Sequence, residues 1–247
     1  MSLEIPLGEQ EHLKEFFELA EQHFKDDRLK SYEKLISYID SMEQQCTDMR
    51  EEIEFLKEQL QGIEGNHLKG KIDALSKSIY EQLFFIGMNI RGVKKGISDQ
   101  IKEMLAELQH GKDQVLNGLF SGLQAKERLE NIRGHLKNVD QRLETGLREL
   151  EQAGRKKEEV KVHKREAMAV FMGKEVKTVG KGYKEGGLQK TLKYIKNLCE
   201  RMEQKTAKMI QAIEKVSSVR SEKQKIDWES KIHPKTGEEV SVPERGR

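Results

Sequence analysis

The chain has 247 residues, of which 36% are charged, 35% hydrophobic and 6% aromatic, with a formal net charge of +2. This hydrophobic content is low for a compact globular protein of that length, and it favours long helices that each bury one stripe of side chains. The three prolines, Pro6, Pro234 and Pro243, lie near the ends, so residues 7–233 contain none. We therefore predict an all-α fold with few, short connections.

The composition also bounds the compartment and the chemistry. The longest purely apolar runs, 83–88 and 167–172, have six residues each and are too short to cross a membrane. No signal peptide is recognised, and Cys46 and Cys199 form no CxxC motif. The histidines lack metal-ligand spacing. We expect a cytoplasmic protein that needs no metal or other cofactor.

Charge is distributed unevenly along the chain. The net charge is −9 over residues 1–62, +1 over 63–154, +6 over 155–190 and +4 over 191–247. The acidic N-terminal part and the basic C-terminal part can pair with each other, or each can face a separate partner.

The acidic N-terminal segment, residues 1–66, is predicted to form two helices. Residues 8–25 place apolar side chains on one helical face. From Tyr32 to Ile63 the apolar residues follow an unbroken 3,4 spacing, which is typical of a coiled-coil seam. The central seam residues are Ile39, Met42, Cys46, Met49, Ile53 and Leu56.

Residues 67–172 are predicted to form a long amphipathic helical arm. In its first half the apolar residues recur with a period of about 3.64, close to the 11-residue repeat of a straight helix. An unbroken helix over 67–110 would span about 65 Å. A break is expected at "LQHGKD", around Gly111, and a second apolar stripe then runs to Leu150.

Within this arm, "LFFIGMNIRGVKKGI" at residues 83–97 combines glycines and an apolar face with Arg91, Lys94 and Lys95 on the other side. One interpretation is close helix packing at small residues, and the other is a helix that lies on a membrane surface. We favour packing, because the polar face also carries carboxylates.

The segment "MGKEVKTVGKGYKEGG", residues 172–187, holds five glycines and four lysines. It lacks the GxxxxGK[ST] spacing of a phosphate-binding P-loop, and a helix precedes it instead of a strand. We predict a flexible joint at residues 173–187, with anion or partner contact as a secondary role. The candidate contact residues are Arg155, Lys156, Lys157, Lys174, Lys177, Lys181 and Lys184.

A second heptad helix is predicted over residues 188–221, followed by a flexible tail at 222–247. The two seams have similar lengths and opposite charge, which favours their antiparallel pairing in an elongated bundle with coiled-coil segments. A homodimer through the same seams is the alternative. We interpret both cysteines as small core residues and not as a redox pair. The seam residues of this helix are Leu192, Ile195, Cys199, Met202, Met209 and Ile213.

Two blocks carry a resemblance: "LISYIDSMEQQ" at 35–45, and "GKEVKTVGKGYKEGGLQKTLKYIK" at 173–196 followed by the heptad helix. They resemble an uncharacterised helical family carried on conjugative elements of gut Firmicutes. The resemblance spans roughly residues 30–217 and does not include the tail. It implies a cytosolic accessory protein of a mobile element, and it assigns no catalytic residue.

No enzyme motif such as GxSxG or HExxH is present. The sequence therefore predicts a protein that acts by binding, as a helical scaffold or adaptor for a protein partner. One alternative is an anti-CRISPR-like inhibitor that binds a nucleoprotein complex of a host defence system through its charged faces, and another is a membrane-surface protein. Nucleic-acid binding by residues 155–190 is less favoured, because only Phe171 and Tyr183 are available for stacking.

Overall fold

The computed structural model describes residues 5–23, 27–61, 66–109, 125–173, 175 and 185–232, with the ends of some helices described by their backbone alone. The elements are a short 3₁₀ helix η1 (Leu7–Glu9) and the helices α1 (Glu11–His23), α2 (Asp27–Gln61), α3 (Asn66–Gln109), α4 (Ala125–Phe171) and α5 (Gly187–Ile232). The described residues contain no strand, so the all-α prediction is confirmed.

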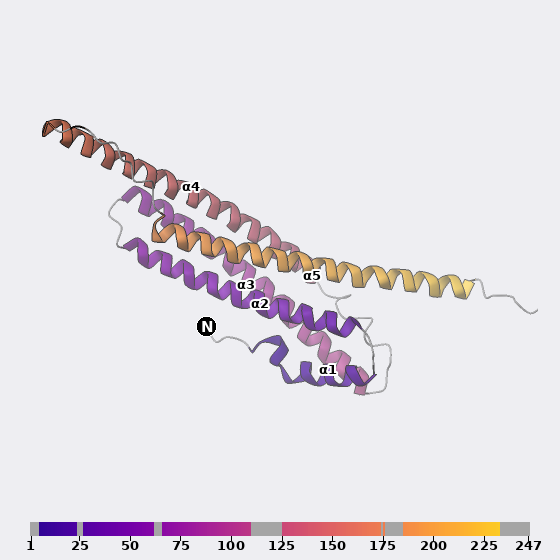
Figure 1. Cartoon of the computed structure of the whole chain (residues 1–247). Helices are drawn as coiled ribbons and strands as arrows, with labels where there is room; N and C mark the ends of the chain where they lie inside the picture. The colour runs from indigo at the N-terminus through magenta and orange to yellow at the C-terminus, as the bar shows by residue number, and fades with distance from the viewer. Residues whose placement is uncertain are drawn as a thin grey trace, which may run out of the picture.

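The helices α2, α3, α4 and α5 form an elongated four-helix bundle (Figure 1). Each packs antiparallel against the helix that follows it, and α5 returns to lie beside α2. This is the up-down-up-down arrangement that short connections favour. The predicted antiparallel helical bundle is therefore confirmed.

The two heptad helices, α2 and α5, meet within one chain. Thr206 Oγ1 lies 3.8 Å from Met42 Sδ, and Lys205 Nζ donates to Ser41 Oγ. Their seams nevertheless face a core shared with α3 and α4, so they are neighbours in a four-helix bundle and not a separate two-stranded coil. The buried seam residues are Ile39, Met42, Cys46, Met49, Ile53 and Leu56 in α2, and Leu192, Ile195, Cys199, Met202, Met209 and Ile213 in α5.

Both cysteines are free and buried in this core. Cys46 Sγ donates to the carbonyl of Leu83 in α3 at 3.5 Å, and Cys199 Sγ donates to the carbonyl of Leu136 in α4 at 3.3 Å. Burial raises the pKa of Cys46 to about 11 and that of Cys199 to about 12. Because the thiolate is the reactive form, these are unreactive core side chains.

The central helix α3 extends from Asn66 to Gln109, within one residue of the predicted 67–110. Its repeating apolar residues are buried against the other helices. That face is therefore covered by protein, whereas Phe84, Phe85 and Met88 of the same helix are exposed. The buried residues of the repeat are Ile72, Ile79, Leu83, Ile86, Ile90, Val93, Ile97, Ile101, Met104 and Leu108.

Two glycines of α3 make room for arginine side chains. A Cβ at Gly87 would lie 2.6 Å from Arg50 Nη2, which donates to the Leu83 carbonyl at 2.9 Å. A Cβ at Gly92 would lie 2.5 Å from Arg128 Nη1. The small residues of 83–97 thus serve packing, through guanidinium groups of α2 and α4.

A buried lysine ties the N-terminal segment to the bundle. Lys94 is only 3% exposed, and its Nζ donates to Glu43 Oε2 at 2.5 Å and to the Ile5 carbonyl at 3.3 Å. Asp40 accepts the first two backbone N–H groups of η1 at 2.8 and 3.0 Å. The start of the chain is therefore fixed by a network that spans α2 and α3.

Within the predicted arm of residues 67–172, the described residues form two antiparallel helices, α3 and α4, and both contribute to the core. The end of α4 extends beyond its neighbours at one end of the bundle, and α5 extends past the opposite end (Figure 1).

Candidate functional site: a projecting helix and the groove at its base

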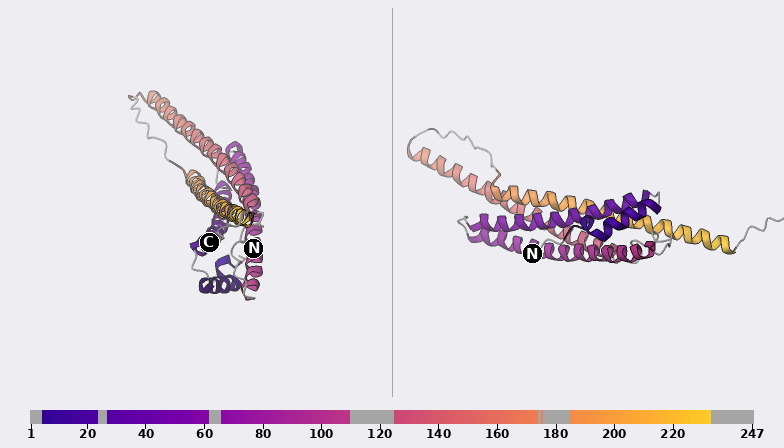
Figure 2. Two further views of the ribbon diagram at one scale, coloured as in Figure 1. Left: turned by 90° about the vertical axis from the view of Figure 1, so that its right-hand side faces the viewer. Right: turned by 90° about the horizontal axis from the view of Figure 1, so that it is seen from below.

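Helix α4 leaves the bundle after Leu150, which is the last of its buried residues, and continues to Phe171 (Figure 2). From here on, the arm means residues 151–173, the projecting end of α4, and not the longer 67–172 segment of the sequence prediction. At 1.5 Å per residue, its helical part is about 30 Å long. The helix ends where Gly173 adopts φ +65°, the left-handed conformation that favours glycine at a helix C-terminus.

The arm has two chemically different sides. Its four carboxylates fall within one sector of about 100° on a 3.6-residue helix. They are Glu151, Glu158, Glu159 and Glu166. A different sector, of about 120°, holds lysines and apolar residues and no carboxylate. We call it the lysine–apolar face, and its members from position 156 onward are Lys156, Lys157, Val160, Lys164, Ala167, Met168 and Phe171, while Ala153 lies in the same sector nearer the bundle.

The apolar members of this face are strongly exposed. Phe171 is 90% exposed, Val160 66% and Met168 59%. In the bundle, by contrast, α4 buries its apolar stripe up to Leu150, with Leu147 alone partly buried among the leucines of the stripe. The difference arises because α3 begins only at Asn66 and so does not extend along the arm.

The cations of the arm are also divided between the two sides. Arg155 pairs with Glu151 at 2.6 Å, and Lys161 pairs with Glu158 at 3.3 Å. Lys156, Lys157 and Lys164 have no ion pair with any residue in the described part of the chain. The lysine–apolar face therefore presents cations that other molecules can reach.

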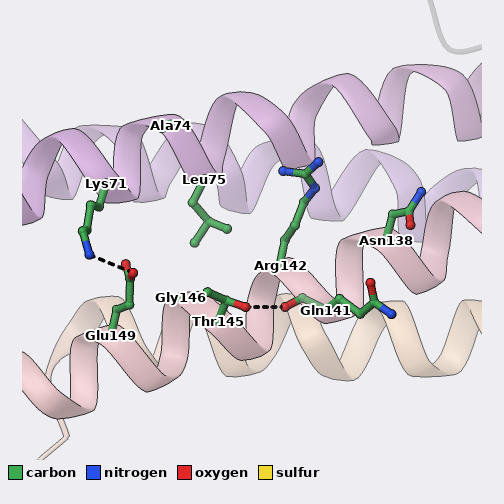
Figure 3. Close-up of a pocket in the computed structure, with 9 residues that line it drawn as sticks. All are labelled: Lys71, Ala74, Leu75, Asn138, Gln141, Arg142, Thr145, Gly146 and Glu149. Carbon is green, nitrogen blue, oxygen red and sulfur yellow. Dashed lines mark hydrogen bonds and ion pairs between the residues drawn. The ribbon is translucent and has the colours of Figure 1, made fainter.

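At the base of the arm, α3 and α4 border a groove of about 540 Å³ (Figure 3). Lys71 Nζ and Glu149 Oε1 pair across its end at 2.9 Å. Leu75 points onto Gly146 in its middle, as Figure 3 shows, and a Cβ at Gly146 would lie 2.3 Å from Leu75 Cδ2. The groove is lined by Lys71, Ala74 and Leu75 of α3 and by Asn138, Gln141, Arg142, Thr145, Gly146 and Glu149 of α4.

The groove and the lysine–apolar face lie on the same side of α4. Steps of three or four residues, with two longer steps of seven, keep one helical side in line along the whole series. It is the side that borders α3 at the groove within the bundle. The series is Asn138, Arg142, Thr145, Glu149, Lys156, Val160, Ala167 and Phe171. Together, the groove and the face form one surface that runs from the bundle onto the arm.

The structure includes only part of the predicted contact set. Arg155, Lys156 and Lys157 lie on the arm and are exposed, and Arg155 is engaged by Glu151. The other four predicted contacts, Lys174, Lys177, Lys181 and Lys184, lie outside the described residues. The groove and the apolar members of the face were not predicted. A weak apolar pattern after Leu150 is their only signal in the sequence.

The acidic helix α1 does not neutralise the arm. It packs against the C-terminal half of α3, where His12 Nε2 lies 2.8 Å from Ser98 Oγ. The arm leaves the bundle beside Lys71, at the other end of α3 (Figure 1). The acidic helix α1 and the basic arm therefore face separate surroundings.

Among the described residues, no group of three or more His, Cys, Asp or Glu side chains is placed to hold a metal ion. None of the described helices is long and apolar enough to cross a membrane.

The fold and the surface define an elongated, antiparallel, all-α bundle from which the ends of α4 and α5 project in opposite directions (Figure 1). The chain belongs to DUF6674, a family of unknown function, which matches residues 9–246. The match includes nearly all of the tail, which the resemblance noted in the sequence does not. Neither a curated protein nor a solved structure shows significant similarity to the chain.

Proposed function

We propose that this protein is a helical adaptor that binds an acidic amphipathic helix of a protein partner along the lysine–apolar face and the adjoining groove. The observation that carries the proposal is the continuation of α4 beyond Leu150 to Phe171, with its apolar side chains exposed. The partner helix would lie where a longer α3 would lie.

Burial of the apolar residues would supply affinity. A helix of this length without tertiary contacts is marginally stable in water, so a partner that covers it also stabilises it. Full burial of a Val, Met or Phe side chain contributes about 1.5–3 kcal/mol. Val160, Met168 and Phe171 together would therefore supply several kcal/mol, in the manner of a helix bound in a groove.

The lysines would select the partner. Lys156, Lys157 and Lys164 lie among the apolar residues, so a complementary helix carries carboxylates beside its apolar stripe. Exposed ion pairs contribute only about 0–1 kcal/mol each. Their main effects are therefore specificity and faster association.

A role in the maintenance or transfer of a mobile genetic element rests on the resemblance of residues 35–45 and 173–196. Inhibition of a host defence complex is a second form of the same proposal, in which the bound helix belongs to that complex. Both forms use the same surface of α4.

In-cell photo-crosslinking tests the proposal. A photoreactive phenylalanine analogue replaces Phe171, and the attached peptide is identified by mass spectrometry. We expect an acidic helical segment of one protein. We also expect the adduct to be lost in a Val160→Ser/Met168→Ser variant and in a Lys156→Gln/Lys157→Gln/Lys164→Gln variant.

The matched control is Arg155→Gln/Lys161→Gln/Arg165→Gln, which removes three charges from the other side of the same arm. Adduct formation should survive in this control. Adducts to nucleic acid or lipid, the absence of any specific adduct, or an equal loss in the control would overturn the proposal.

A further inference from the structure

A second pocket, of about 480 Å³, lies at the opposite end of the bundle from the arm. Gln10, the residue just before α1, lines it on one side, and Ser98 lines it from one face of α3. Nothing in the adaptor proposal uses this pocket.

The α3 side of the pocket carries a line of cations. Arg91, Lys95 and Lys102 line it at spacings of four and seven residues, with Ser98 between the two lysines. These spacings place all four residues on one helical face. Like charges on neighbouring turns of a helix repel one another, and one carboxylate three or four residues from the two lysines offsets only part of this repulsion. Asp99 is the single carboxylate of the lining.

Two further cations lie beside this line. Lys94 also borders the pocket, but its ammonium is already bonded to Glu43. Gly92 is a lining residue as well, and the Arg128 guanidinium of α4 lies against it, 2.5 Å from where a Cβ would be. Because position 92 has no side chain, the guanidinium of an arginine from a second helix can lie beside the line of cations.

The Gln10 side of the pocket is held in place by hydrogen bonds. Ser98, which is 9% exposed, donates its hydroxyl to Gln10 Oε1 at 3.1 Å, and its Oγ lies 2.8 Å from His12 Nε2. Because the serine hydroxyl donates to Gln10, its oxygen accepts the Nε2–H of His12. Burial and then the charge of Lys102 lower the pKa of His12. The positive field of the pocket therefore reaches this imidazole.

We propose that this pocket binds a small phosphorylated anion, with Arg91, Lys95 and Lys102 contacting a phosphate or diphosphate group. The planar guanidinium of arginine matches two phosphate oxygens at once, and each lysine adds a point charge. The lining contains no aromatic side chain on which a nucleobase could stack. The phosphate group itself is therefore the recognised part, whether the source is inorganic diphosphate or a nucleotide.

Titration calorimetry of the full chain with inorganic diphosphate tests this proposal, with ATP and sulfate as parallel ligands. The test variant is Lys95→Gln/Lys102→Gln. The control, Lys156→Gln/Lys157→Gln, makes the same charge change on the arm. We expect at least a tenfold weaker diphosphate affinity in the test variant and an unchanged affinity in the control. All four lysines are exposed, so circular dichroism should show an unchanged fold.

Comparison of the ligands distinguishes the sources. Similar affinities for diphosphate and ATP would indicate that the phosphate group is sufficient, and a much tighter ATP complex that needs Lys95 and Lys102 would indicate a nucleotide. Saturation with either ligand should raise the pKa of His12, measured from its ring proton resonances. Three results would overturn the proposal: no binding at millimolar diphosphate, equal weakening in the control, or a His12 titration that saturation does not alter.

Discussion

Leu75 of α3 occupies the space that a side chain at Gly146 of α4 would need. A Cβ at position 146 would lie 2.3 Å from Leu75 Cδ2 and 3.4 Å from Leu192 Cδ1 of α5. Glycine inside a helix costs about 0.5–1 kcal/mol relative to alanine. The glycine is retained here at the point where three helices converge, at the floor of the groove.

Replacing Gly146 with leucine should force Leu75 from its position and separate α3 from α4. We expect the free energy of unfolding to fall by about 1–3 kcal/mol, as for other overpacked cores. Urea denaturation measures the change. Addition of Leu75→Ala should restore part of the loss, with a coupling energy of about 0.5–3 kcal/mol.

Gly134 of the same helix provides the control, because a Cβ there would meet nothing within 4 Å. Gly134→Leu should leave stability unchanged or raise it slightly, through better helix propensity. Equal effects at positions 134 and 146 would show that the contact with Leu75 does not determine the helix spacing.

Lys94 should stabilise the N-terminal segment far more than its neighbour Lys95 does. Lys94→Met removes the cation that bonds to Glu43 and to the carbonyl of Ile5. We expect a loss of about 1–3 kcal/mol in the free energy of unfolding, since partly buried acceptors are left unpaired. Proteolysis near residues 5–10 should also become faster.

The matched substitution Lys95→Met affects an exposed side chain and should change stability by no more than about 0.5 kcal/mol. Denaturation curves of the two variants, together with limited proteolysis, measure the contrast. Indistinguishable variants would mean that the Lys94 network does not hold the start of the chain.

The seams of α2 and α5 could be predicted from sequence because their chemistry is regular. Every core position from Ile39 to Leu56 follows the heptad spacing, and burial of an apolar stripe is the main driving force for such helices. The repeat of α3 is equally clear, and its bounds were predicted within one residue. Local periodicity was therefore sufficient to predict the fold class.

The exposure of individual side chains depended on how the helices pack against one another and on where each helix ends. Lys94 and Lys95 are adjacent and chemically identical, yet one is buried and the other exposed, because only Lys94 faces Glu43. Val160 and Phe171 resemble core residues in the sequence, and they are exposed because α3 does not extend beside them. Contacts of this kind are set by tertiary packing, and no local sequence pattern reveals them.

The two buried thiols should make stability fall at alkaline pH. Each folded-state pKa, about 11 for Cys46 and about 12 for Cys199, lies above the ordinary value of 9.0. Above pH 9 the unfolded chain therefore loses protons that the folded chain retains, which favours unfolding. The expected slope is at most about 1.4 kcal/mol per pH unit for each thiol.

Urea denaturation in reductant at pH 8, 9 and 10 measures this slope. Cys46→Ala/Cys199→Ala should be less stable at pH 8, because it creates cavities, but its stability should fall less steeply with pH. Other titrating groups are common to both proteins. Parallel pH profiles would contradict an assignment of the alkaline loss to these thiols.

Hydrogen exchange should divide α4 into two parts at Leu150. Residues 125–150 are packed in the core, and their amides should exchange only through global or large-scale unfolding. The arm has helical hydrogen bonds but no buried apolar residue, so its amides should exchange at least a hundredfold faster. Exchange followed by mass spectrometry on overlapping peptides measures the boundary.

Paired substitutions provide the control for this division. Ala167→Gly, in the arm, should speed exchange locally and leave the midpoint of global unfolding unchanged, because the arm contributes nothing to the core. Leu143→Ala, in the bundle, should lower global stability by about 2–5 kcal/mol. Strong protection of the arm in the isolated chain would mean that something already covers it, and the exposed lysine–apolar face would then not be free to bind a partner helix.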